Sequence, residues 1–229
     1  QVRVLPGSPI NRTMIEVISY PRTGSTYVQK ILWAYINDTN DHKRYNERQI
    51  EPFKKDVDPT LVDSIKNSKD TWVVKNHVFH YDNVHHEFLK NEWEPIVEEK
   101  VYCVRQDHFK CAISYCVAIV LDRYFWYLHE YEELEPFYID ESFFMKEYNN
   151  IVSWHNRILK EAHEYVDKIV CYESLSLDPA TDYMMIMNHA WGEELPRWQT
   201  STQKTPLDYP TIVQNYEDLE KKVKKNVSG

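Results

Sequence analysis

The sequence predicts an α/β fold, in which a central parallel sheet of four to five strands is flanked by helices. Two observations lead to this prediction. Strand-like segments alternate with helical segments along the chain, and the strand-like segments are continuous apolar runs, which are typical of strands covered on both faces. No convincing linker or internal repeat interrupts the 229 residues, so we expect a single domain over residues 1–229.

In the first half of the chain, two apolar runs predict strands. Residues 14–20 form a run that stops at a proline, and residues 71–76 are rich in β-branched and aromatic side chains. After the first run, apolar residues follow helical spacing from Gly24 onwards. Residues 38–57 are polar and predict an exposed loop. A short helix is expected over residues 59–68, because a proline stands at its first position.

In the second half, residues 100–105 and 169–172 are the predicted strands. Asp107 can cap the helix that follows the first of them, and Asp140 can cap a long helix over residues 140–166. Two more helices are expected, near residues 179–191 and from Pro210 towards Lys225.

Charge and composition argue against several classes of protein. A formal net charge of −9 does not fit a general nucleic-acid binder, which presents a basic face. No apolar run approaches the roughly 20 residues of a membrane span, and no signal segment is recognised, so we expect a cytoplasmic protein. The four cysteines lie in predicted strands and helices without the paired spacing of a zinc site. We therefore expect buried thiols rather than a disulfide framework, and no metal.

The segment from Tyr20 to Thr26 forms a strand–loop–helix unit with the elements on either side. Such a unit presents backbone N–H groups and the positive end of a helix to an anion. Gly24 would let the backbone approach a phosphate closely, and Arg22 adds a positive charge. The GxxxxGK[ST] pattern of nucleoside triphosphatases is absent. From this segment alone, a phosphate-binding loop and an ordinary helix start capped by Ser or Thr both remain possible.

Residues 19–32, SYPRTGSTYVQKIL, resemble the phosphosulfate loop of sulfotransferases that use 3′-phosphoadenosine 5′-phosphosulfate (PAPS). The resemblance implies transfer of a sulfonate group from PAPS to a hydroxyl or amine of an acceptor, with 3′-phosphoadenosine 5′-phosphate (PAP) as the product. It implies that Tyr27 takes the place of a tryptophan that stacks on adenine. It also implies that the 5′ end of the donor is bound by the loop residues Arg22, Thr23, Gly24, Ser25 and Thr26.

A second motif, VVKNH at residues 73–77, is similar to the strand-end KTH of the cytosolic members of this family. The resemblance implies that His77 is the general base and that Lys75, together with Arg22, offsets the charge of the transferred group. Imidazole suits this role because its pKa lies near neutrality. Two alternatives stay open for His77. It could be a solvent-side residue of a histidine-rich loop, or part of a metal site with His80, His85 and His86. A carboxylate base, as in other branches of the family, also stays open.

A third motif, VYCVR at residues 101–105 followed by AISY at residues 112–115, resembles the family's 3′-phosphate motif. It implies that Arg105 and Ser114 bind the 3′-phosphate, and the planar fork of an arginine suits phosphate oxygens. The Arg-to-Ser separation is nine residues, one more than is usual in the family. Either the turn carries an extra residue, or Ser114 is displaced from the phosphate.

The last part of the chain resembles the family less closely. Residues 171–175, CYESL, are similar to the segment after the family's fourth strand, which implies that Tyr172 approaches the adenine. The family's C-terminal RKG loop is not recognisable, and Lys204 is the nearest basic substitute. Aromatic residues are frequent in residues 124–144, which could line an acceptor pocket or form a lid that packs inward.

The sequence leaves the acceptor, a small molecule or a carbohydrate, and the oligomeric state undetermined. Two other functions are compatible with the same fold. One is a P-loop kinase of small molecules, which would need ATP and magnesium. The other is a nucleotide-binding protein without catalytic activity.

Overall fold

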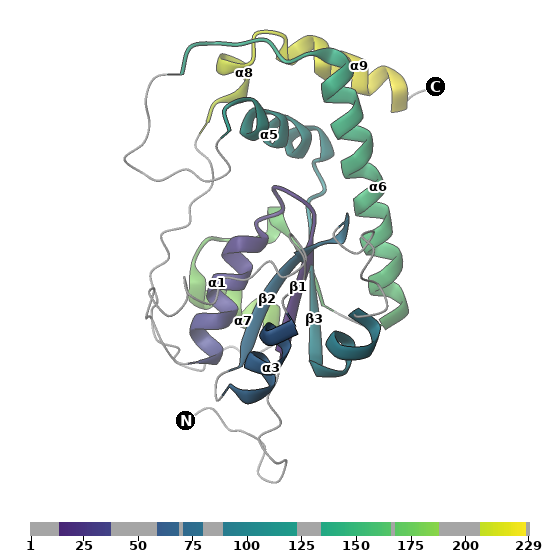
Figure 1. Cartoon of the computed structure of the whole chain (residues 1–229). Helices are drawn as coiled ribbons and strands as arrows, with labels where there is room; N and C mark the ends of the chain where they lie inside the picture. The colour runs from purple at the N-terminus through teal and green to yellow at the C-terminus, as the bar shows by residue number, and fades with distance from the viewer. Residues whose placement is uncertain are drawn as a thin grey trace.

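The computed structural model describes residues 14–37, 59–68, 71–79, 89–122, 134–165, 168–187 and 207–227, and the structure is discussed over these ranges. Its centre is a four-stranded parallel sheet with the strand order β2-β1-β3-β4 (Figure 1). The strands are β1 (Met14–Ser19), β2 (Trp72–His77), β3 (Val97–Val104) and β4 (Lys168–Cys171). The predicted α/β class and parallel sheet are confirmed.

The helices connect and cover these strands. They are α1 (Ser25–Ile36), α3 (Pro59–Asn67), α5 (His108–Val120), α6 (Glu141–Tyr165), α7 (Pro179–Met187), α8 (Tyr209–Ile212) and α9 (Tyr216–Val227). Short π- and 3₁₀-helical turns lie at Leu89–Trp93, Glu94–Ile96 and Tyr172–Ser174. No helix in the described ranges is both long and apolar enough to cross a membrane.

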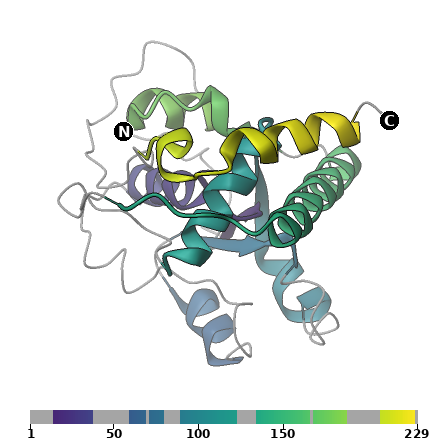
Figure 2. The same cartoon turned by 90° about the horizontal axis from the view of Figure 1, so that it is seen from above.

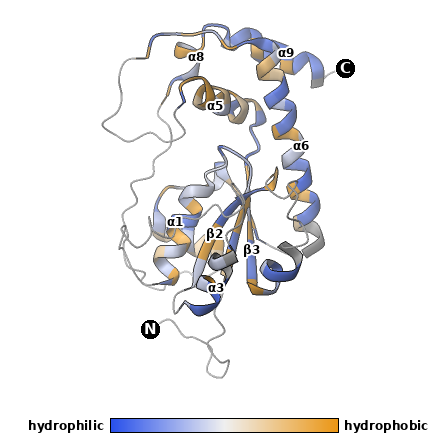
Figure 3. Cartoon of the chain, viewed as in Figure 1, coloured by the Kyte–Doolittle hydropathy of each residue, from blue (hydrophilic) through white to orange (hydrophobic). Residues whose placement is uncertain are grey.

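The two faces of the sheet bury two separate apolar clusters, because successive residues of a strand point to opposite faces. Ile15 and Val17 of β1 pack in the cluster that contains the apolar residues of α1 and α7. Ile18 packs on the other face, in the cluster formed with α5, α6 and α9. Helix α5 is hydrophobic along most of its length and the strands carry hydrophobic segments, whereas α6 and α9 are largely hydrophilic with apolar residues interspersed (Figure 3). Figure 2, seen from above, shows α9 starting over α5 and extending to α6.

Both predicted helix caps are present. The Asp107 carboxylate accepts a hydrogen bond from the backbone N–H of Lys110 at 2.9 Å, and that of Asp140 accepts one from Phe143 at 2.8 Å. The predicted final helix is divided into α8 and α9. Between them, Val213 forms a parallel bridge with Phe137. The side chain of Asn215, two residues later, bonds to the backbone N–H and carbonyl of Ile139. These long-range hydrogen bonds replace the helical ones at this point.

The four cysteine thiols are free, and Cys103, Cys111 and Cys116 are buried. Burial raises the pKa of each of these three thiols above its ordinary value. They therefore behave as small apolar core residues, as the sequence predicts.

Candidate functional site

The candidate site lies where the four strands end. Because all strands are parallel, the segments that follow them meet at one edge of the sheet. The loop after β1 leads into α1, His77 ends β2, Arg105 follows β3, and Tyr172 follows β4. The four sequence motifs are thus brought to the same edge, although they lie far apart in the chain.

The loop between β1 and α1 is held in shape by its own residues. The Thr23 hydroxyl donates to the carbonyl of Tyr20 at 3.0 Å, and Arg22 and Gly24 both adopt left-handed backbone conformations, with φ of 67° and 77°. Gly24 is the N-cap of α1, and within the described residues no side chain caps this end. The structure therefore does not support the interpretation of a helix start capped by Ser or Thr. The positive end of the helix points into the loop, an arrangement suited to an anion.

We expect Gly24→Ala to destabilise the protein by about 1–2 kcal/mol, the cost of a left-handed conformation for a residue with a Cβ. A Cβ atom at this position would also approach Tyr172 Cδ2 to 3.0 Å and Leu175 Cδ1 to 3.2 Å. The free energy of unfolding in urea measures the effect. A stability equal to that of the wild type would mean that the loop adopts another conformation.

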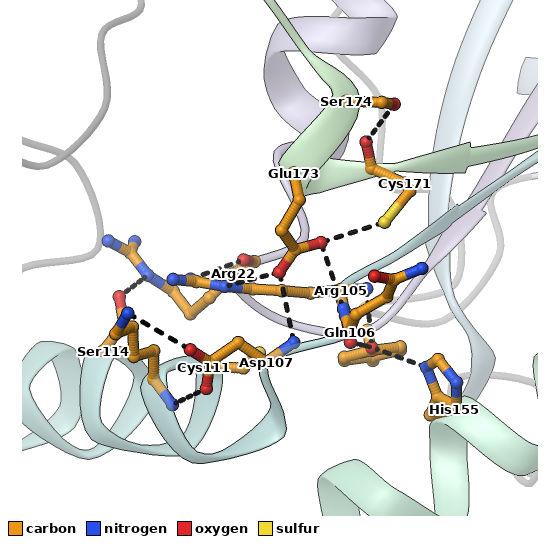
Figure 4. A network of polar contacts seen from close by, with 12 residues as sticks. Arg22, Arg105, Gln106, Asp107, Cys111, Ser114, His155, Cys171, Glu173 and Ser174 are labelled. Atoms are coloured by element: carbon orange, nitrogen blue, oxygen red, sulfur yellow. Dashed lines mark hydrogen bonds and ion pairs between the residues drawn. The ribbon is translucent and has the colours of Figure 1, made fainter.

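A cluster of polar side chains lies beside this loop (Figure 4). Arg22 Nε donates to Ser114 Oγ at 2.8 Å, and the Tyr209 hydroxyl donates to the same oxygen at 2.9 Å. Arg105 Nη1 donates to the carbonyl of Arg22 at 3.4 Å. The structure thus brings Arg22, Arg105 and Ser114 together despite the longer Arg-to-Ser spacing.

The Arg105 side chain is held from two sides but keeps donors unused. Its guanidinium lies 4.4 Å from the centre of the Tyr172 ring, and its Nε lies 3.9 Å from a carboxylate oxygen of Glu173. This Nε is buried and has no hydrogen-bond acceptor among the described residues. A guanidinium carries five N–H donors, so the group fits an anionic ligand that would accept from those remaining.

The backbone of Arg105 is fixed by Tyr20. The Tyr20 phenol donates to the carbonyl of Arg105 at 2.9 Å and accepts from its N–H at 2.8 Å, and it lies 3.1 Å from His155 Nδ1. Burial raises the pKa of Tyr20 above its ordinary value, so the phenol keeps its proton. The residue before the loop therefore determines where the end of β3 lies.

Glu173 fixes the turn after Arg105. Its carboxylate accepts from the backbone N–H groups of Gln106 and Asp107, each at 3.1 Å, and from the Cys171 thiol at 2.9 Å. Burial alone would raise the pKa of Glu173, but these hydrogen bonds outweigh it and hold the pKa below its ordinary value.

The lowered pKa gives Glu173 a pH-dependent role in stability. Its contribution is fully present above the ordinary value of about 4.5 and is lost as the pH falls from there through the lower folded-state value. We therefore expect Glu173→Gln to cost stability at neutral pH, and this cost to shrink at pH values below 4.5. The difference in the free energy of unfolding in urea between the wild type and the variant, measured from neutral pH to below 4.5, gives this cost. A cost that stays constant with pH would contradict the role assigned to the carboxylate.

Lys75 lies on the other side of the loop. Its side chain is 3% exposed, and its Nζ donates to Thr26 Oγ1, in the first turn of α1, at 3.1 Å. Burial and the charge of Lys75 lower the pKa of Lys30, one helical turn beyond Thr26. The Nζ of Lys75 thus lies buried beside the start of α1.

His77 is the last residue of β2 and contacts both the neighbouring strand and an aromatic pair. Its Nδ1 lies 3.0 Å from Ser19 Oγ. Its ring stacks on Phe79 at 5.3 Å between centroids, and Phe79 in turn packs on Trp154 of α6 at 4.8 Å. The ring is therefore held in one orientation at the strand end, rather than standing free in solvent.

The remaining predicted site residues that the structure describes are buried. They include Thr23 in the loop and Ser25 at the start of α1. Tyr27 is 2% exposed, and its hydroxyl donates to the buried Asp182 of α7 at 2.7 Å, so its ring belongs to the core beneath α1. Stacking of Tyr27 on adenine would require the ring to leave this position. Lys204 and the three histidines that follow His77 lie outside the described residues.

Several residues of the site were not predicted from the sequence. They are Ser19, Tyr20, His155, Glu173 and Tyr209. Ser19, Tyr20 and Tyr209 form hydrogen bonds with predicted residues, Glu173 bonds to the turn after Arg105, and His155 contacts Tyr20. Tyr20 and Tyr209 each precede a proline, which is the one local signal that sets them apart. Over the described ranges, no group of three or more His, Cys, Asp or Glu side chains is placed to hold a metal ion.

Comparison with known proteins finds similarity among solved structures. No protein-family model and no curated protein sequence matches the chain. Among solved structures, the chain is similar to retinol dehydratase in complex with androsterone and the inactive cofactor PAP, with 17% sequence identity, a TM-score of 0.46 and 92% of this chain covered. The chain spans 65% of the length of that neighbour.

Proposed function

We propose that this chain is a sulfotransferase that transfers a sulfonate group from PAPS to a hydroxyl or amine of an acceptor and releases PAP. One observation carries the proposal. The loop that resembles a phosphosulfate loop lies beside Arg105 and Ser114, the two residues that resemble a 3′-phosphate site, at the carboxyl edge of a parallel sheet. Both ends of the same nucleotide would therefore be recognised within one site.

Arg105 and Ser114 would bind the 3′-phosphate. Arg105 is anchored by Tyr172 and Glu173 and keeps N–H donors unused among the described residues. The hydroxyl of Ser114 already accepts from Arg22 and Tyr209, so its own proton can be donated to a phosphate oxygen. Two guanidinium groups held close together also favour an anion between or beside them.

The 5′ end of the donor would lie against the loop, where the backbone of Gly24 and the side chains of Arg22 and Thr26 meet the start of α1. Tyr172 is the better candidate for contact with adenine, because Tyr27 is buried in the core.

We propose that residues 1–229 form a single sulfotransferase-like domain.

Transfer would proceed by in-line displacement. A bond forms between the acceptor oxygen or nitrogen and sulfur, the bond between sulfur and the 5′-phosphate oxygen of PAPS breaks, and His77 takes the acceptor proton. Lys75 and Arg22 would offset the negative charge that develops on the leaving phosphate. The acceptor class, a small molecule or a carbohydrate, is left to experiment.

The proposal is tested by incubating the protein with PAPS and a mixture of phenolic, steroid, amine and carbohydrate acceptors, and following PAP release together with sulfonate incorporation. We expect PAP release that depends on an acceptor. Phosphate transfer from ATP with magnesium would instead identify a kinase. PAP binding without turnover of any acceptor would favour a nucleotide-binding protein that lacks activity.

A further inference from the structure

The Ser19 hydroxyl contacts the ring of His77, the proposed base. The two residues are paired across β1 and β2 at the ends of these strands. Ser19 is fully buried, and its Oγ contacts His77 Nδ1 at 3.0 Å and the carbonyl oxygen of Asn76 at 3.3 Å. Both contacts of the hydroxyl therefore lie at the end of the strand that carries the proposed base.

The direction in which Ser19 donates its hydroxyl proton decides which ring nitrogen of His77 is protonated. A serine hydroxyl has one proton, and a backbone carbonyl can only accept. If Ser19 donates its proton to the Asn76 carbonyl, then the Ser19–His77 hydrogen bond requires a proton on Nδ1 of the histidine. A neutral imidazole carries one ring proton, so Nε2 then has the lone pair.

The plane of the ring is held separately. Phe79 stacks on the His77 ring with an interplanar angle of 22°, and Trp154 supports Phe79 from α6. With its face held by Phe79 and its Nδ1 by Ser19, the ring has a defined direction for Nε2.

We propose that Ser19 is a positioning residue, which selects the His77 tautomer with its proton on Nδ1 and so leaves Nε2 to accept the proton of the acceptor. This inference rests on the proposed function for its catalytic consequence. The choice of tautomer itself is a property of the folded chain and can be measured without turnover.

The test uses the full chain labelled with ¹⁵N at histidine, in wild-type, Ser19→Ala, Ser19→Thr and His77→Ala forms. The ring nitrogen shifts at a pH where His77 is neutral report its tautomer, and His77→Ala assigns the signals. We expect the Nδ1–H form in the wild type and in Ser19→Thr. In Ser19→Ala we expect a shift towards the Nε2–H form, which imidazole favours in water.

Kinetics test the catalytic consequence. We expect kcat to fall by about 10-fold in Ser19→Ala, part of the roughly 100- to 10,000-fold that a general base supplies, with PAP affinity unchanged. Ser19→Thr should restore most of the rate. In a His77→Ala background, the Ser19→Ala change should have no further effect, because the residue it positions is gone. Ser64→Ala is the matched control, since the hydrogen bond that this exposed serine forms among the described residues stays within α3.

The outcomes separate the two claims. An Nε2–H tautomer in the wild type, or a tautomer that Ser19→Ala leaves unchanged, would overturn the role of Ser19. A rate loss in Ser19→Ala that persists in the His77→Ala background would assign Ser19 a different role. If the tautomer changes as expected but no acceptor is turned over, the control of His77 by Ser19 stands and the sulfotransferase proposal fails.

Discussion

Replacing Arg105 with alanine is expected to weaken PAP binding by about 30-fold or more, which corresponds to about 2 kcal/mol or more. Hydrogen bonds to charged groups contribute roughly 1.5–3 kcal/mol each, and a guanidinium can form two with one phosphate. The side chain is already held by the ring of Tyr172 and the carboxylate of Glu173. Little conformational entropy would therefore be lost when the nucleotide binds. Isothermal titration calorimetry with PAP measures the change.

Two further variants serve as controls for the Arg105→Ala result. Arg105→Lys keeps the charge but loses the planar fork, so its affinity should fall between those of wild type and Arg105→Ala. Arg157→Ala removes an arginine of α6 that pairs with Glu161 one turn away, and PAP affinity should not change. Urea unfolding of each variant checks that the fold is intact. If Arg105→Ala binds PAP as tightly as the wild type does, the 3′-phosphate lies elsewhere.

Replacing His77 with alanine is expected to lower kcat by roughly 100- to 10,000-fold, the range supplied by a general base. PAP affinity should stay the same, because the described contacts of His77 are with Ser19 and Phe79, whereas the predicted phosphate-binding residues are Arg105 and Ser114. Steady-state turnover of PAPS, with calorimetry of PAP binding alongside, separates the two effects.

The matched comparison is Ser114→Ala, for which we expect the opposite pattern, a loss of PAP affinity larger than the loss of kcat. If turnover survives His77→Ala undiminished, the base is another group, such as a carboxylate. The donor site would be unaffected by that outcome, because it depends on Arg22, Arg105 and Ser114.

The parts of the fold that the sequence predicts are those with local signals. Each strand contains an apolar run, and Asp107 and Asp140 stand where helix caps are needed. The start of β3 at Val97 has no such signal, because Glu98, Glu99 and Lys100 precede its apolar run. The division between α8 and α9 has no such signal. It depends on hydrogen bonds from Asn215 to Ile139, a residue 76 positions away in the chain. A helical pattern cannot reveal a partner at that distance.

In the candidate site too, the residues with local motifs could be predicted and the contacts that support them could not. Motifs placed Arg22, Lys75, His77 and Arg105 at strand ends, and the parallel sheet brings them to one edge. The supporting contacts could not be read from the motifs, because they join residues far apart in the chain. Tyr20 binds the backbone of Arg105, and Glu173 binds the turn after it.

Tyr27 illustrates a limit of motif reasoning. The aromatic residue after the loop is expected to face the nucleotide, yet Tyr27 is buried and bonded to Asp182. A motif identifies the position in the chain, whereas the direction of the side chain is decided by the partners that the fold supplies. The buried carboxylate of Asp182, which accepts a hydrogen bond from the Tyr27 hydroxyl, is such a partner.

Titration of the wild-type protein with PAP, AMP and ATP plus magnesium tests the central claim most directly. PAP and AMP differ only in the 3′-phosphate, which Arg105 and Ser114 would bind. We therefore expect PAP to bind about 30-fold more tightly than AMP, by the same hydrogen-bond energies as above, and to bind without magnesium. Equal affinities for PAP and AMP, no binding of PAP, or a preference for ATP with magnesium would contradict the assignment of this sheet edge as a PAPS site.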